Sequence, residues 1–192
     1  LVFAKNATAH AFLQKAFNDR TVEKTYLALV YGVPKEKKGV IDFDIGRSRK
    51  DFRLRSAQPK AKGKLREART RYEVLGEEKG YALLKVQPET GRMHQIRAHL
   101  KAIHHPVVGD TLYAPGLSKS EAIGNKPQSR GTPNHPSVPS ISRLALHAYT
   151  LNLPLPSGTR VLITAPIPND LASSFSLFRE ANEKFALLYD AC

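Results

Sequence analysis

Residues Glu89 to Leu100 read Glu-Thr-Gly-Arg-Met-His-Gln-Ile-Arg-Ala-His-Leu. A glycine ends one element here, and basic and amide side chains crowd the start of the next. Ile96, Leu100 and Ile103 follow at a spacing of i, i+4 and i+7, which predicts a helix with one apolar face. Arg97 lies on another face, where a guanidinium can bind a carboxylate or a phosphate through two hydrogen bonds. A helix with a simply solvated basic side is the alternative interpretation.

The segments around this helix indicate the fold class. Residues 68–75 and 81–87 predict two strands, and residues 76–80 join them as an antiparallel hairpin. Helices are expected at residues 7–18, capped by Asn6, and at residues 170–189. Further strands are expected at residues 25–31, 40–45, 145–153 and 160–165. This order is typical of an α+β fold with a mixed, mostly antiparallel sheet and flanking helices.

We interpret residues 1–192 as a single domain. Residues 114–142 are rich in Pro, Ser, Gly and Asn, and we expect them to form a mobile surface insertion. Residues 1–5 look like the end of a strand, which suggests that the sequence starts inside a domain.

The charge of the chain points to a polyanionic partner. Lys and Arg number 30 against 17 Asp and Glu, which gives a net charge of +13. Such an excess favours nucleic acid as the partner. Eleven of the basic residues fall within residues 47–71, where only Asp51 and Glu67 oppose them. This segment reads as a loop or a ragged hairpin, and a solvated basic loop without a partner is the alternative.

Several other site classes find no support in the sequence. Cys192 is the only cysteine, which excludes an internal disulfide and makes a reducing cytoplasm the default location. No apolar run approaches the length of a membrane span. His94, His99, His104 and His105 lack the i, i+4 spacing of helical metal ligands, so we expect no metal site. A Gly-x-Ser-x-Gly elbow and a glycine-rich phosphate loop are also missing from the sequence.

Four ordered motifs match one known family. Residues 24–32 contain a Lys-x-Tyr strand, and residues 91–100 match the family's third motif. Residues 105–113 match a His-Pro-x-x-Gly-Asp-x-x-Tyr turn, and residues 143–148 match an Arg-x-x-Leu-His-Ala strand. Together these motifs, which span nearly the whole chain, resemble the pseudouridine synthases of the RluA type.

The resemblance implies an RNA-modifying enzyme. Such enzymes isomerise uridine in rRNA or tRNA: they break the bond from ribose to N1 of uracil and rejoin the base through C5, without a metal or an organic cofactor. An aspartate is essential in the family, an arginine of the third motif pairs with it, and a tyrosine stacks on the target base. The matching positions are Arg97 and Tyr26. We expect further RNA contacts from Lys24, Arg47, Arg49, Lys50, Arg92 and His94.

Base extrusion explains why an aromatic side chain is needed. A uridine inside a stacked helix must be flipped out at a cost of a few kcal/mol. Stacking on an aromatic ring returns about 1–3 kcal/mol. An ordinary strand tyrosine is the alternative interpretation of Tyr26.

The family's aspartate has no match in this sequence. It belongs to a His-Arg-Leu-Asp segment that would precede Leu1, and we expect Asp110 only to fix the turn in which it lies. We therefore expect a cytoplasmic, monomeric synthase as the parent protein, and a chain that is inactive alone. A noncatalytic RNA-binding module is the main alternative. A nuclease is a weaker one, because it would need a metal or a general-base pair.

Overall fold

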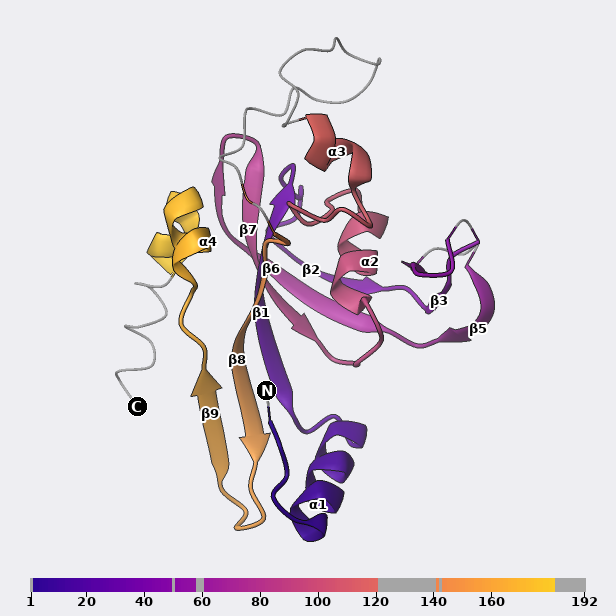
Figure 1. Cartoon of the computed structure of the whole chain (residues 1–192), viewed down its shortest axis with the longest axis vertical. Helices are drawn as coiled ribbons and strands as arrows, with labels where there is room; N and C mark the ends of the chain where they lie inside the picture. The colour runs from indigo at the N-terminus through magenta and orange to yellow at the C-terminus, as the bar shows by residue number, and fades with distance from the viewer. Residues whose placement is uncertain (1, 50, 58–60, 121–140, 142, 182–192) are drawn as a thin grey trace.

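Two antiparallel sheets form the frame of the molecule (Figure 1). The computed structural model describes residues 2–49, 51–57, 61–120, 141 and 143–181. The larger sheet has the order β2-β6-β7-β1-β8-β9, and the smaller sheet has the order β4-β3-β5. The strands are β1 Glu23–Tyr31, β2 Lys38–Asp42, β3 Ile45–Arg47, β4 Arg55–Ser56, β5 Lys62–Arg66, β6 Arg69–Glu78, β7 Tyr81–Pro88, β8 Leu146–Pro154 and β9 Arg160–Thr164. The helices are α1 Ala7–Asn18, α2 Gln95–Ala102, α3 Pro115–Ser120 and α4 Asn169–Ser174.

The α+β class and the mostly antiparallel pairing are confirmed. Strands β1 and β7 lie at the centre of the larger sheet and pair antiparallel, with Leu29 opposite Leu83. Both strands carry continuous apolar runs, which is the pattern of a strand covered on both faces. Their side chains are almost completely buried and pack with Ile96 and Leu100 of α2 and with Phe178 near the C-terminal end.

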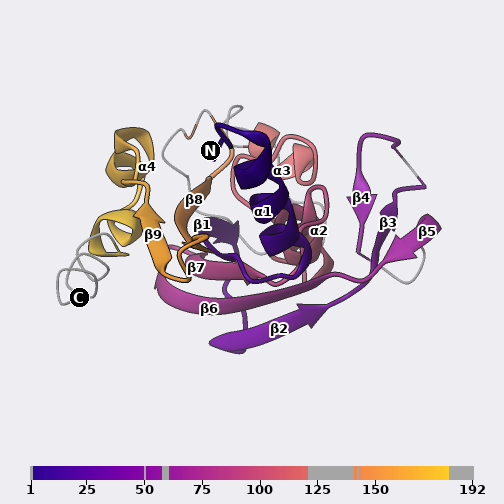
Figure 2. The same ribbon diagram turned by 90° about the horizontal axis from the view of Figure 1, so that it is seen from below.

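The small sheet lies at the opposite end of the molecule from α4 in both ribbon views (Figures 1 and 2). The basic segment that we expected to be a loop or hairpin forms much of this sheet. Its own core is small and includes Ile45, Ala57 and Ala68, against which Ala98 of α2 and Tyr113 pack. Helix α2 therefore joins the small sheet to the core of the large one.

Two strand predictions need correction. The single strand expected at residues 40–45 is split at Phe43 and Asp44, so that β2 and β3 belong to different sheets. The antiparallel hairpin expected at residues 76–80 is confirmed, but its turn is shorter, because β6 continues to Glu78 and the chain turns at Lys79 and Gly80. Both turn residues have positive φ, as two-residue hairpins of type I′ require.

The ends of the chain also differ in part from expectation. Helix α1 has its predicted bounds, and Asn6 caps it by accepting the Ala9 N–H at 2.8 Å. Residues 2–5 form no strand, and the Phe3 side chain is 81% exposed. The expected helix at residues 170–189 is interrupted at Phe175, whose backbone is extended. Residues 182–192 lie outside the described residues.

The expected insertion at residues 114–142 begins with helix α3, so its first part has regular structure. Most of its remainder, residues 121–140 and 142, lies outside the described residues. Among the described residues, none of the helices has both the length and the apolarity to cross a membrane.

Candidate active site

Gln95 fixes the start of α2 against the large sheet. Its Nε2 donates to the carbonyl oxygen of Arg69 and to Thr70 Oγ1, both at 3.0 Å. Its Oε1 accepts the hydroxyl proton of Thr90 at 2.7 Å and the N–H of Arg92 at 2.9 Å. Gln95, Thr70 and Thr90 are buried, so each of these bonds compensates a group that is removed from water.

His99 continues this network one helical turn later. Its Nε2 lies 2.9 Å from the carbonyl oxygen of Phe43, and its Nδ1 lies 2.9 Å from Thr70 Oγ1. A carbonyl oxygen only accepts, so Nε2 carries the proton and Nδ1 accepts the Thr70 hydroxyl. Burial lowers the pKa of His99 and favours this neutral form. His99 is therefore a structural residue, a role that the sequence analysis did not assign.

Arg97 points to the turn that follows α2. Its Nε and Nη2 bind the two carboxylate oxygens of Asp110, each at 2.7 Å. The Asp110 side chain is completely buried, and its Oδ1 also accepts the N–H groups of Leu112 and Tyr113 at 3.0 and 2.8 Å. The bond to Asp110 raises the pKa of Arg97, which remains a fixed cation.

This ion pair is new information on Arg97 and confirms the expectation for Asp110. The upstream carboxylate that we expect to face Arg97 stays a prediction, and within this chain the structure pairs Arg97 with Asp110. Asp110 does fix its turn, as the sequence predicted. Gly109 is needed just before it, since its φ is +72° and a Cβ there would lie 2.1 Å from the carbonyl oxygen of Arg143.

Tyr113 connects the small sheet to the start of α2. Its hydroxyl oxygen accepts the N–H of Arg55 at 2.9 Å and lies 3.2 Å from His94 Nδ1. Its ring also faces the Arg97 guanidinium, whose central carbon is 4.8 Å from the ring centroid. Burial raises the pKa of Tyr113, so its hydroxyl keeps a proton that it can donate to His94. Desolvation and the charge of Arg97 lower the pKa of His94, which favours a neutral ring as the acceptor.

A cleft of about 260 Å³ brings most of the predicted site residues together. Its lining includes Lys24, Tyr26, Arg92, His94 and Arg97. The side chains of Lys24 and Tyr26 are both partly removed from water. This burial lowers the pKa of Lys24 and raises the pKa of Tyr26. Between Thr25 and Tyr26 the pairing of β1 with β8 shifts register, and such irregularities re-aim side chains.

The remaining predicted contacts lie elsewhere. Arg47 lines a second pocket against the small sheet, and Arg49 lines a third one beside Lys101. Lys50 lies outside the described residues. A larger and mainly apolar cleft of about 570 Å³ lies beside α1 and shares Lys24 and Tyr26 with the cleft of about 260 Å³.

Comparison with known proteins agrees with this geometry. The profile of a family described as RNA pseudouridylate synthase matches residues 1–102, which is more than half of the chain. The chain belongs to this family. The resemblance to the RluA type is thereby confirmed.

Individual pseudouridine synthases extend the match. An uncharacterized RNA pseudouridine synthase of Chlorobaculum parvum is 36% identical over 173 residues, which are 89% of this chain and 51% of that protein. Ribosomal large subunit pseudouridine synthase D of Nitrosomonas europaea is 39% identical over 183 residues, 93% of this chain and 47% of that protein. The chain thus spans about half the length of the curated relatives that it matches.

A solved structure shows the same fold. Human RNA Pseudouridylate Synthase Domain Containing 1 is 28% identical and superimposes with a TM-score of 0.69. The match covers 91% of this chain and 66% of the human one. The chain is therefore similar to pseudouridine synthases along nearly its whole length.

Replacing Asp110 with Asn should strongly destabilise the protein. The substitution leaves Arg97 without its carboxylate, and breaking a buried pair typically costs about 3–5 kcal/mol. The matched control is Asp170→Asn, because Asp170 binds Nε and Nη2 of Arg143 in the same way but at an exposed position. Urea unfolding should show a much smaller loss of unfolding free energy for the control. Equal losses in the two variants would mean that burial does not increase the contribution of the Arg97 pair to stability.

Acidification should destabilise the protein through His99. Its pKa is lowered by burial, so the unfolded chain binds the proton more readily. The stabilisation that neutral His99 gives the folded protein is complete above the ordinary histidine pKa of 6.5. It is lost as the pH falls from 6.5 through the lowered pKa of His99 in the folded protein. Urea unfolding between about pH 7.5 and 5 measures this decline. The fall of the unfolding free energy with pH should become smaller in His99→Asn and stay unchanged in His104→Asn, because His104 is exposed. The same fall in His99→Asn as in the wild type would contradict the conclusion that His99 is neutral in the folded protein.

Proposed function

We propose that the protein containing this chain is an RNA pseudouridine synthase whose target uridine occupies the cleft of about 260 Å³, which we call the uridine cleft. The observation that carries the proposal is the convergence of Lys24, Tyr26, Arg92, His94 and Arg97 on one cleft. These residues come from β1, the loop before α2 and α2 itself, so only the fold brings them together. A module that only bound RNA would not need a partly buried tyrosine and a fixed guanidinium in the same cleft.

Tyr26 is the residue that we assign to the flipped base. The extruded uracil loses its stacking neighbours, and a tyrosine ring in the cleft replaces part of that interaction. Burial raises the pKa of Tyr26, so its hydroxyl remains protonated and adds no charge beside the neutral base. Lys24, two residues earlier on the same strand, lines the same cleft and can contact the phosphate of this nucleotide.

The proposed reaction is a balanced isomerisation. The bond between C1′ of ribose and N1 of uracil breaks, the base rotates, and C1′ bonds to C5. The hydrogen on C5 leaves and N1 gains a proton, so no oxidant or reductant is required. A carboxylate must assist, and we propose that it comes from a His-Arg-Leu-Asp segment of the whole protein. Arg97 would keep this carboxylate ionised, because nearby positive charge lowers a carboxyl pKa.

Asp110 leaves Arg97 free for that role. The ion pair uses Nε and Nη2, whereas Nη1 donates to none of the described residues. Arg97 can therefore keep its position through Asp110 and still offer a donor to the cleft that it lines. The substrate is structured RNA, rRNA or tRNA, and rRNA is the first to test because the Nitrosomonas europaea relative is named for the large ribosomal subunit.

Release of tritium from RNA labelled at C5 of uridine tests the function, because that hydrogen is lost on isomerisation. The whole protein should release tritium. Arg97→Ala leaves the buried Asp110 unpaired, so its turnover is compared at a temperature at which circular dichroism shows the variant folded. There it should lower kcat by at least about 10²–10³-fold, the loss typical of a missing electrostatic group. RNA affinity should change little, since phosphate contacts provide most of it.

Arg160→Ala is the control, because Arg160 lies on β9 and bonds with Glu23 and Asn152 away from the uridine cleft. It should retain wild-type turnover. The present chain alone should release none. Turnover by this chain would contradict the need for an upstream aspartate, and near-normal turnover by Arg97→Ala would contradict the role of Arg97. RNA binding by the whole protein without tritium release from any RNA would identify a noncatalytic module.

Tyr26 variants should separate ring stacking from the hydroxyl. Tyr26→Phe keeps the aromatic face, so it should retain most of the affinity for a stem-loop RNA with a uridine in the loop. Tyr26→Leu removes the face and should weaken binding by about 1–3 kcal/mol. Fluorescence anisotropy measures both. Equal affinities of the Phe and Leu variants would show that Tyr26 is only a packing residue.

A further inference from the structure

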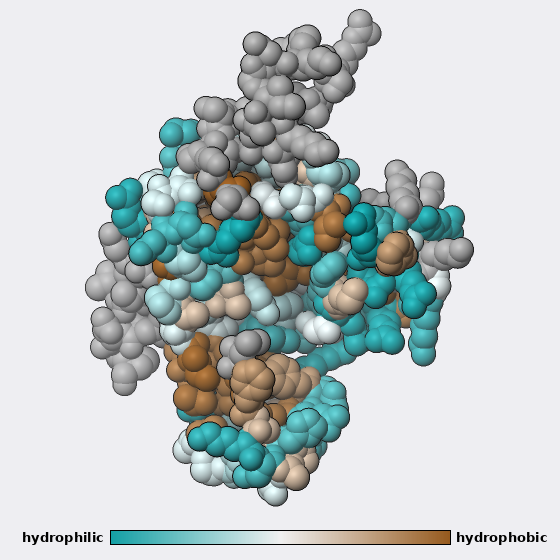
Figure 3. Space-filling model, in the orientation of Figure 1, coloured by the Kyte–Doolittle hydropathy of each residue, from teal (hydrophilic) through white to brown (hydrophobic). Residues whose placement is uncertain are grey.

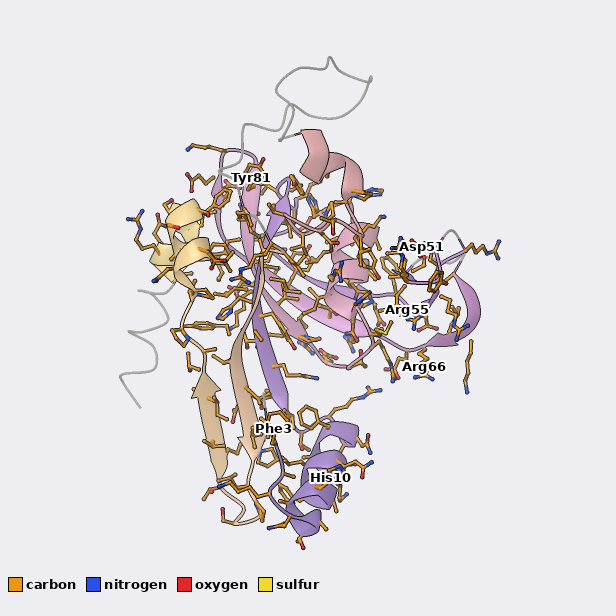
Figure 4. All side chains as sticks on the ribbon, viewed as in Figure 1. Phe3, His10, Asp51, Arg55, Arg66 and Tyr81 are labelled. Carbon is orange, nitrogen blue, oxygen red and sulfur yellow. The ribbon has the colours of Figure 1, made fainter. Side chains whose placement is uncertain are left out.

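A second pocket of about 480 Å³ lies between the small sheet and the loop before α2. We call it the basic pocket. Five cationic residues line it, and its described lining contains no acidic residue. The five are Arg47, Arg55, Lys64, Arg66 and Arg92. Figure 4 places Arg55 and Arg66 on the small-sheet side of the molecule, far from Phe3 and His10 beside α1. Figure 3 shows mostly hydrophilic surface over this region.

The charges of the basic pocket are not paired with carboxylates in the part of the chain that the structure describes. Among the described residues, none of the five forms an ion pair with a carboxylate. Cations around the pocket do have such partners: Arg53 binds Asp51, and Arg71 binds Glu89. Glu67 follows Arg66 in the chain, but its carboxylate is bound by Arg20. The basic pocket is thus a concentration of positive charge that an anion would stabilise.

Arg92 forms a wall that the basic pocket shares with the uridine cleft. Its Nε donates to the carbonyl oxygen of Glu67 at 2.9 Å, and its backbone N–H donates to Gln95. These bonds hold the guanidinium at the boundary between the two spaces. An anion in the basic pocket and a base in the uridine cleft can therefore contact the same arginine.

The lining of the basic pocket lets a polymer backbone approach closely. Gly63 and Gly91 belong to the lining, and a Cβ at either position would meet nothing within 4 Å. A volume of about 480 Å³ lies within the range of about 300–1,000 Å³ typical of small-ligand sites. The basic pocket therefore suits a short stretch of sugar and phosphate better than a whole duplex.

We propose that the basic pocket binds the RNA backbone directly adjacent to the target uridine. Phosphates there would pair with the unneutralised arginines, and Arg92 would set the register between backbone and flipped base. The inference rests on the proposed function in taking the RNA base as the occupant of the uridine cleft. Phosphate contacts of this kind fix the position of a nucleic acid without reading its sequence.

Salt-dependent binding of a fluorescein-labelled stem-loop RNA to this chain tests the basic pocket. The variant Arg47→Gln/Arg66→Gln should bind about tenfold more weakly at low salt. The slope of log affinity against log salt should fall by about 1.4, which corresponds to two single-strand phosphates. The control Lys35→Gln/Arg179→Gln removes two exposed charges that have no ion pair among the described residues. It should keep the slope, and an equal fall in both variants would mean diffuse attraction and overturn the proposal.

Neutral methylphosphonates, introduced singly along the RNA, test the register. Next to the target uridine they should weaken binding several-fold for the wild-type chain and hardly at all for Arg47→Gln/Arg66→Gln. An equal loss of affinity in the wild-type chain and in Arg47→Gln/Arg66→Gln would mean that these phosphates bind outside the basic pocket.

Tritium release by the whole protein separates the two proposals. Pocket-dependent binding without release would refute the proposed function and the register to a target uridine, but not the binding of RNA backbone by the basic pocket. Release with an unaltered salt slope in the pocket variant would refute the basic pocket alone.

Discussion

The buried ion pair between Arg97 and Asp110 is the constraint on which the arrangement of the site depends. A carboxylate with no exposure to water is costly unless it is fully paired, and Asp110 satisfies its oxygens with Arg97 and two backbone N–H groups. The pair locks α2 to the turn that follows it. That turn in turn places Tyr113 against Arg97 and His94. Loss of this one carboxylate would therefore disturb the cleft as well as the fold.

Helix α2 has eight residues, and its different faces contact different parts of the molecule. Gln95 and His99, four residues apart, bind the large sheet through buried hydrogen bonds. Ile96 and Leu100 enter the main core, and Ala98 packs against the small sheet. Because these faces are packed or hydrogen-bonded to three different parts of the molecule, the helix has little freedom to rotate or slide. This rigidity gives the guanidinium of Arg97 a defined position, which the role proposed for it requires.

The helices and strands that have strong local sequence patterns were predicted correctly. The predictions were wrong where contacts between distant segments determine the structure. The apolar runs of β1 and β7 and the cap of α1 at Asn6 were correctly predicted from local patterns. The break at Phe43 was missed, because its carbonyl is needed by His99, which lies 56 residues away. The small sheet was missed for a similar reason, since its basic strands show no apolar alternation and depend on packing against α2 and Tyr113.

The site shows the same division between local and tertiary information. Tyr26, Arg97, Lys24, Arg92 and His94 were predicted from their motifs, and the structure brings them to one cleft. The pairing of Arg97 with Asp110 was not predicted, because thirteen residues and a turn separate the two side chains. Gln95 and His99 also carried no signal, since a polar residue on a helix is usually exposed. Their role became visible only with the buried threonines that they bind.

Charge in this molecule serves two different purposes, and the distribution of carboxylates distinguishes them. Arg97 and Arg143 have acidic partners that fix local structure, and these pairs add little net field. The arginines of the basic pocket have none among the described residues, so their field extends into solvent. Tyr113 links the two groups, because its hydroxyl binds both the backbone of Arg55 and the ring of His94. The Tyr113 hydroxyl therefore holds strand β4 of the small sheet in a fixed position relative to His94, which lines the cleft around Tyr26.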